Sequence, residues 1–175
     1  MERRSIAAIL AGIGAFLAAV GPLGHGTAGI IGVVLLFAGL IVLADAYGDV
    51  AMKNNAVWWF VFAFVAAIVL ALAVGTAIAS LIGGLLAGRF LWSALPLAVA
   101  GVVGLAAAWI LFLLSAARFK AVMDSLADKT GEGLFRTAGQ LYRWGAVLII
   151  ALVGIVLLVI AYVLAGVALL IVGTK

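Results

Sequence analysis

The sequence predicts an all-α integral membrane protein with about five transmembrane helices. Of its 175 residues, 69% are hydrophobic and only 9% are charged, whereas soluble domains average about 45–50% apolar and about 25% charged residues. The mean hydropathy is +1.47. A soluble chain of this composition would lack the polar surface that water requires, so lipid is the solvent that fits it. The length suits a single polytopic membrane domain over residues 1–175.

Five apolar runs mark the expected spans. A span needs about 20 apolar residues to cross a hydrocarbon core of about 30 Å. The third run stays apolar as far as Gly88, which is longer than one crossing requires. We therefore expect this helix either to tilt or to break near Gly83–Gly84. The spans cover about residues 5–20, 30–45, 57–82, 95–117 and 145–172.

Residues 118–144 form the one clearly amphipathic region. Two apolar stripes recur there at helical spacing, and the segment Thr130–Gly133 separates them. We expect a cytoplasmic amphipathic helical hairpin between the fourth and fifth spans, with its stripes on the membrane surface or against neighbouring helices. The first stripe is Phe119, Val122, Met123 and Leu126, and the second is Leu134, Phe135, Ala138, Leu141 and Tyr142.

The basic residues predict the orientation. Cytoplasmic loops of membrane proteins are enriched in lysine and arginine. With a cytoplasmic N-terminus, eight basic residues fall inside and two, Arg89 and Lys175, fall outside. We expect a multi-pass protein of the cell membrane with its C-terminus outside. The four tryptophans near span ends are typical of an interfacial aromatic belt: Trp58, Trp59, Trp92 and Trp144.

Small residues recur at every fourth position in several spans. Such rows let another helix approach closely. The row can serve packing within the chain, or it can face another protomer or another membrane subunit. The row in the third span is Ala63, Ala67, Ala71, Gly75, Ala79 and Gly83, and that in the first is Ala7, Ala11, Ala15 and Ala19.

The predicted spans carry little chemistry. No Asp, Glu, Lys, Arg or His lies away from a span end, and the chain has no cysteine and one histidine. Coupled transporters place ionisable groups at depth, and thiolate catalysis needs cysteine. We therefore expect no catalytic, cofactor-binding or metal-binding residue, and no enzyme. The net charge of +4 sits in short loops, so membrane lipid is the expected partner and nucleic acid is not.

Asp45 and Asp49 stand four residues apart after the second span. Carboxylates at this spacing share a helix face and could hold a divalent cation beside a lipid phosphate. The plainer interpretation is a solvated helix end with Lys53 as counter-charge. We expect Arg136 or Arg143 to reach one of these carboxylates and to fix how the hairpin docks.

Two polar stretches resemble a known family when taken together. One is Leu43-Ala-Asp-Ala-Tyr-Gly-Asp49 leading to Lys53-Asn-Asn-Ala-Val-Trp58, and the other is Leu134-Phe-Arg-Thr-Ala-Gly-Gln-Leu-Tyr142. They are similar to mainly archaeal small membrane proteins grouped as domain of unknown function, family 996. The resemblance implies the same multi-span topology and suggests that residues 45–55 and 134–142 matter. It implies no activity.

Three functions fit these observations. The first is a non-enzymatic membrane component, either an accessory or structural subunit or a protein that assembles with copies of itself. The alternative is a small oligomeric channel or carrier for an uncharged or apolar solute, because small-residue helices can enclose a pore. A lipid-modifying enzyme comes third and depends only on Asp45 and Asp49. A dry interior favours the structural role, whereas a continuous polar path favours the channel.

Overall fold

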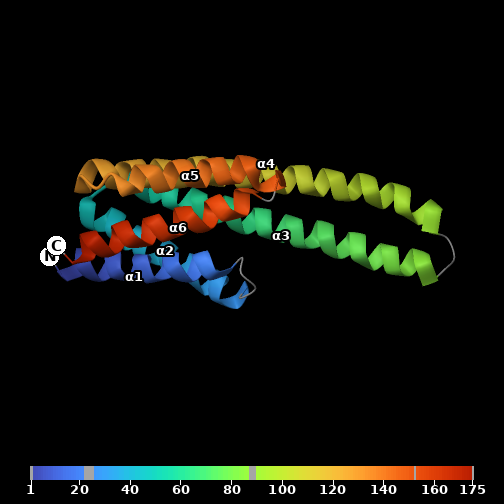
Figure 1. Cartoon of the computed structure of the whole chain (residues 1–175), viewed down its shortest axis with the longest axis horizontal. Helices are drawn as coiled ribbons and strands as arrows, with labels where there is room; N and C mark the ends of the chain where they lie inside the picture. The colour runs from blue at the N-terminus through green and yellow to red at the C-terminus, as the bar shows by residue number, and fades with distance from the viewer. Residues whose placement is uncertain (1, 22–25, 87–89, 152, 175) are drawn as a thin grey trace. The chain divides into compact units, whose positions relative to one another are not determined.

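The computed structural model describes residues 2–21, 26–86, 90–151 and 153–174, and every element in these ranges is helical (Figure 1). Five of the helices, α1, α2, α3, α4 and α6, are long and apolar enough to cross a membrane. The prediction of an all-α protein with five candidate spans is confirmed. The elements are α1 (Glu2–Val20), α2 (Gly26–Tyr47), α3 (Val50–Leu86), α4 (Phe90–Thr130), α5 (Leu134–Leu148), the short 3-10 helix η2 (Ile149–Ala151) and α6 (Val153–Gly173).

Helix α4 is longer than the fourth apolar run. It continues past Ala117 to Thr130, so the expected fourth span and the first half of the expected hairpin form one helix. The reason is that residues 118–130 are polar on one face but contain neither glycine nor proline. Helix α3 likewise runs unbroken through Gly83–Gly84.

Helices α2 and α4 are each followed by a glycine with a positive φ. Gly48 follows α2 with φ 63°, and Gly131 follows α4 with φ 73°. Glycine adopts this left-handed conformation without a Cβ penalty, and the turn returns an N–H to the last helical carbonyls. Gly48 donates to the Asp45 carbonyl at 3.1 Å, and Gly131 donates to the Ala127 carbonyl at 2.9 Å. The predicted break at Thr130–Gly133 is confirmed.

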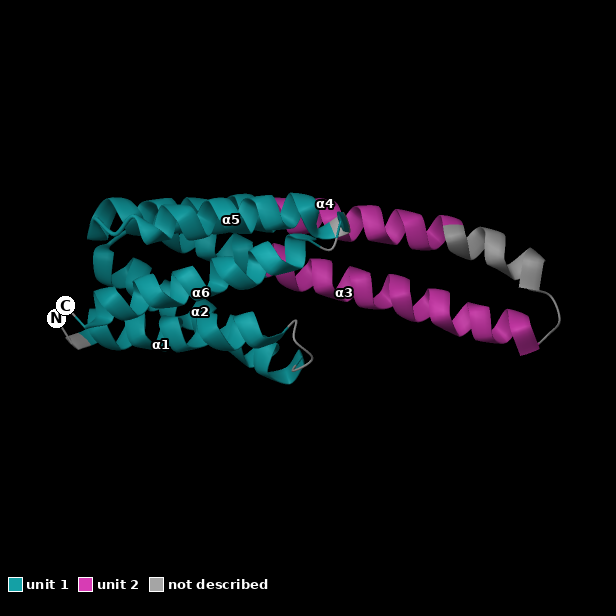
Figure 2. Cartoon of the chain, viewed as in Figure 1, with its two compact units in different colours: residues 1–60, 115–175 teal, residues 61–114 magenta. Residues whose placement is uncertain are grey.

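The chain divides into two compact units, which share the continuous helices α3 and α4 (Figure 2). Unit 1 comprises residues 1–60 and 115–175, and unit 2 comprises residues 61–114. Unit 2 contains a close helix contact at Gly104, where an added Cβ would lie 2.6 Å from the Cβ of Ala73. The Thr76 hydroxyl donates to the carbonyl of Leu72 in its own helix at 2.8 Å.

The small-residue row of the third span does not pack as expected. A Cβ added at Gly75 or Gly83 meets no atom of the described chain within 4 Å, and Ala67, Ala71 and Ala79 are exposed. The interpretation as an intramolecular contact is therefore wrong at these glycines. An α-helix turns about 100° per residue, so a row at every fourth position drifts about 40° per step and winds off one face. Contact with another protomer stays a prediction.

In unit 1, α1 and α2 approach until their backbones touch. A Cβ added at Gly32 would lie 2.2 Å from the Ala18 backbone nitrogen, and one added at Gly39 would lie 2.8 Å from the Ala11 Cα. Only glycine allows so close an approach. Ala7, Ala11, Ala15 and Ala19 are all buried. The predicted row in the first span is confirmed, because α1 packs against both α2 and α6 and the drifting row stays covered.

Helices α1 and α6 run antiparallel, so the start of α1 lies beside the end of α6 (Figure 1). A Cβ added at Gly12 would touch Leu170, and one added at Gly173 would lie 3.2 Å from the Ser5 carbonyl oxygen. We expected these two helix ends on opposite sides, and the structure places them at the same end of unit 1.

The difference arises in the last apolar run. Helix α5 ends at Leu148 and α6 begins at Val153, so residues 145–172 contain a tight turn instead of one span. A Cβ at Gly154 would lie 2.3 Å from both the Gly145 carbonyl oxygen and the Ile149 nitrogen. This glycine contact lets α5 and α6 form an antiparallel hairpin, which adds one pass along unit 1.

Candidate functional site

Asp49 organises the charged end of unit 1. It precedes α3, and its Oδ1 accepts a hydrogen bond from the Met52 backbone N–H at 2.8 Å. This is the position and bond of a helix N-cap. Its other oxygen accepts a hydrogen bond from the Ser125 hydroxyl at 2.7 Å and lies 3.2 Å from the Lys129 ammonium. The carboxylate thus joins the start of α3 to the last turns of α4.

These bonds shift the titration of Asp49. Hydrogen bonds to the ionised carboxylate favour the charged form. The Met52 N–H, followed by the Ser125 hydroxyl, lowers the pKa of Asp49 to about 2, and Lys129 adds to the effect while partial burial opposes it. The side chain is only 16% exposed. Asp49 is therefore ionised at every physiological pH and serves as a fixed anchor.

Asp45 has a different partner. The Lys53 ammonium lies 2.7 Å from its Oδ1, and both side chains are about half exposed. The interpretation of a solvated helix end with Lys53 as counter-charge is confirmed. Asp45 and Asp49 engage separate cations. Among the described residues, no group of three or more His, Asp or Glu could hold a metal ion.

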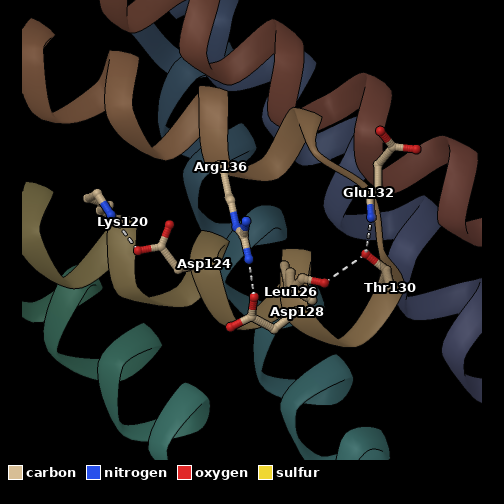
Figure 3. A network of polar contacts seen from close by, with 7 residues as sticks. All are labelled: Lys120, Asp124, Leu126, Asp128, Thr130, Glu132 and Arg136. Atoms are coloured by element: carbon tan, nitrogen blue, oxygen red, sulfur yellow. Dashed lines mark hydrogen bonds and ion pairs between the residues drawn. The ribbon is translucent and has the colours of Figure 1, made fainter.

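The expected contact between the α5 arginines and these carboxylates is not what the structure shows. Arg136 pairs with Asp128, across the turn that joins α4 to α5 (Figure 3). Arg143 is exposed and makes no ion pair with the described residues. Because α4 continues to Thr130, Ser125 and Lys129 share the helix face beside Asp49 and occupy it. The tight turn leaves Arg136 opposite Asp128 instead.

Three contacts were not predicted from the sequence: those of Ser125 and Lys129 with Asp49, and the bond from Arg118 to Asn55. The Arg118 guanidinium donates to the Asn55 side-chain oxygen at 3.0 Å, which ties α4 to α3 a second time. The spacing of Ser125 and Lys129 predicts that they share a helix face, because residues four apart lie on one side of a helix. The partner could not be found this way, since nothing in the sequence reveals which face of α4 meets α3.

An open groove of about 660 Å³ runs between the first turns of α3 and the last turns of α4. Its walls include Asp49, Asn55, Asp124, Asp128 and Lys129, so three carboxylates face one ammonium. Outside the groove, Lys120 pairs with Asp124, and Arg136 pairs with Asp128 (Figure 3). We call it the acidic groove for its lining, which carries three carboxylates and one ammonium, and each carboxylate is paired with one cation: Asp49 with Lys129, Asp124 with Lys120 and Asp128 with Arg136.

Below the charged end lies an aromatic cluster of the buried Trp59, Phe119 and Tyr142 and the partly buried Tyr162. The Phe119 and Tyr142 rings are 4.4 Å apart between centroids. The Trp59 indole N–H donates to the Tyr142 hydroxyl at 3.4 Å, and that hydroxyl lies 3.3 Å from the Tyr162 hydroxyl. Buried polar atoms need such partners. The cluster joins α3, α4, α5 and α6 within unit 1.

Trp59 corrects one sequence expectation. We placed it in an interfacial aromatic belt, but its side chain is fully buried, and its carbonyl accepts a hydrogen bond from Ser115 at 3.1 Å. Trp58 and Trp144 are exposed, as a belt requires. The side chain of Trp92, like Arg89 and Lys175, lies outside the described residues. Adjacent tryptophans on a helix face different directions, so only one of Trp58 and Trp59 can face outward.

A family model described as Protein of unknown function (DUF996) matches residues 28–163, which is more than half of the chain. The chain belongs to this family. The DUF996 match contains both polar stretches on which the resemblance rested, and the resemblance is confirmed. The match runs from Ala28 in α2 to Val163 in α6 and so includes the Asp49 anchor, the acidic groove and the aromatic cluster. Comparisons with curated proteins and with solved structures gave no match.

Proposed function

We propose that this protein is a non-enzymatic membrane component that assembles with copies of itself. The observation that carries the proposal is a mismatch between two sides of unit 1. Helices α1, α2 and α6 present apolar residues outward, whereas the start of α3, the end of α4 and most of α5 present charged and polar residues. Both sides occupy the same stretch of the unit.

Two sets of contacts define that stretch. At one end, Arg4 of α1 donates to the Ala46 carbonyl of α2 at 2.9 Å, and Asp49 meets Lys129. Further along, the Phe37 ring of α2 stacks on Phe60 of α3 at 4.4 Å, and Tyr142 meets Tyr162. Over this stretch, its two ends included, the apolar side exposes Ile6, Ile9, Leu10, Ile13 and Val42, and the charged side exposes Arg118, Asp128, Arg136, Gln140 and Arg143.

A bilayer cannot cover both sides. Helices α1, α2 and α6 are long and apolar enough to cross the hydrocarbon core, and lipid suits their outer faces. At the same depth, exposed arginine and aspartate are costly against lipid tails and face protein or water instead. Burying the charged side against another copy removes it from lipid, which favours self-assembly.

The interior of a single copy supports a structural role. The described core of unit 1 is apolar apart from Ser115 and the hydrogen-bonded Trp59 and Tyr142. Every buried side-chain nitrogen or oxygen among the described residues has a hydrogen-bond partner. An apolar interior whose buried polar atoms are hydrogen-bonded offers no polar path through the described core of unit 1. We therefore place the alternative, a small oligomeric channel or carrier for an uncharged or apolar solute, at the interface between copies.

We also propose that the charged end faces the cytoplasm. Lysine and arginine near the ends of spans set the orientation of membrane proteins, because they are enriched on the cytoplasmic side. Arg4, Lys53, Arg118 and Lys129 all lie at or near this end through contacts with Ala46, Asp45, Asn55 and Asp49. This assignment puts the start of α1 and the end of α6 on the same, cytoplasmic side.

The test is the oligomeric state in lipid. The protein, reconstituted in nanodiscs and extracted with native lipid, is weighed by native mass spectrometry across a range of protein-to-lipid ratios. We expect a discrete oligomer. A monomer at every ratio would overturn the proposal. Flux of small uncharged solutes into proteoliposomes then separates the two functions, because only the channel gives flux above that of empty vesicles.

A further inference from the structure

The charged side of unit 1 carries two strips of opposite sign. One, the basic strip, is the outer face of α5 with Arg136, Thr137, Gln140 and Arg143, all exposed. Helix α5 contains no acidic residue. The other is the acidic groove between α3 and α4, with Asp49, Asp124 and Asp128 against Lys129. The strips lie next to each other, because a Cβ at Gly139 of α5 would lie 3.3 Å from the Lys120 Cα of α4.

We propose that two copies dock face to face about a twofold axis, with the basic strip of each α5 seated along the acidic groove of the other. This rests on the proposed self-assembly and names its interface. A twofold contact brings the same patch of both copies together, so a patch must complement itself. Adjacent strips of opposite sign do so, because rotation by 180° sets each strip on its opposite.

The groove favours a second copy over anionic lipid. Lipid phosphates would be drawn to Arg136 and Arg143 but repelled by the carboxylates of the neighbouring groove. A second copy satisfies both strips at once and offers charge complementarity along the whole face. It also gives Arg143 a carboxylate partner, which the described part of a single chain does not provide.

The existing ion pairs leave the strips free to exchange partners. Arg136 and Asp128 are 63% and 64% exposed, so their contact is a surface pair open to water. Such pairs contribute little and reorganise easily. Asp49, in contrast, accepts bonds from three donors, so we expect it to keep its position in the groove when the strips exchange partners.

The test uses two complementary charge reversals in the full chain. One variant carries Arg136→Glu with Arg143→Glu, and the other carries Asp124→Lys with Asp128→Lys. Each alone sets like charges face to face, so we expect each to run as a monomer in nanodiscs where the unaltered protein is a dimer. Mixed by coexpression, they should restore the dimer as a one-to-one heteromer. Arg3→Glu, a reversal on α1 outside both strips, should leave the dimer intact.

A second measurement changes no charge and covers the case in which a reversed variant fails to fold. Differently tagged copies carrying Gln140→Cys on the basic strip and Ala121→Cys in the groove are coexpressed and oxidised. We expect a disulfide between the two tags. A stable oligomer that forms neither the cross-link nor the selective heteromer overturns the interface and leaves self-assembly standing. A monomeric unaltered protein overturns the proposed function itself.

Discussion

At the scale of single residues, Asp49 has two structural roles. As the N-cap of α3 it accepts the Met52 N–H, and through Ser125 and Lys129 it fixes the last turns of α4. A capping carboxylate also complements the positive end of the helix dipole. Asp45, only four residues earlier, has one surface partner. The two carboxylates have the same charge and lie close together in the sequence, but Asp49 should contribute more to stability than Asp45.

We expect Asp49→Asn to destabilise the protein by about 1.5–3 kcal/mol at pH 7, the usual contribution of hydrogen bonds to a charged group. The pKa of Asp49 is lowered to about 2 from an ordinary 3.8, so the ionised form stabilises the fold above pH about 4. That stability is lost as the pH falls toward 2. Denaturant or SDS titration of both proteins at several pH values should show their difference shrinking over this interval.

Asp45→Asn is the matched control. Its exposed pair with Lys53 should contribute about 0–1 kcal/mol. Equal losses in the two variants at pH 7 would contradict the anchoring role of Asp49, and so would a difference between unaltered and Asp49→Asn protein that persists unchanged at pH 2.

At the scale of elements, glycine decides which helices touch. Gly32 lies where the α1 backbone meets α2, whereas Gly75 faces open space in the described chain. We expect Gly32→Leu to destabilise the protein by about 1–3 kcal/mol or more, because bulk inserted into a packed site forces backbone shifts. Gly75→Leu should be close to neutral in the monomer. Thermal unfolding in detergent measures both, and equal melting temperatures would refute the contact assignment.

The helices also differ in how well the sequence predicted them. The spans of α1, α2 and α3 followed from their apolar runs, because lipid selects such runs directly. The turn between α5 and α6 was missed because residues 148–153 are as apolar as a span interior, and only Gly145 and Gly154 mark it. Asp45 was paired correctly with its near neighbour Lys53, whereas the partners of Asp49 lie 76 and 80 positions away. Such contacts depend on how helices pack, which residue spacing does not reveal.

At the scale of the whole molecule, the α5–α6 hairpin sets where the chain ends. Helix α6 packs antiparallel to α1, so the residues near Gly173 lie beside Ser5. Five simple crossings would separate them across the membrane. The hairpin instead returns the end of α6 to the end of unit 1 where α4 turns into α5 and Arg136 meets Asp128 (Figure 1). Thr174 and Gly133 should therefore face one compartment.

We expect Gly133→Cys and Thr174→Cys to react with a membrane-impermeant thiol reagent from the same side, and only after permeabilisation if that side is cytoplasmic. The chain has no cysteine of its own, so each label reports one position. Gly133 is exposed, with open space where a Cβ would lie, and Thr174 is exposed after α6. Labelling of the two sites from opposite sides of sealed cells would contradict the antiparallel packing of α1 and α6 in the membrane. Labelling of both in intact cells would keep the packing and reverse the proposed orientation, because charge bias decides only which compartment the shared end enters.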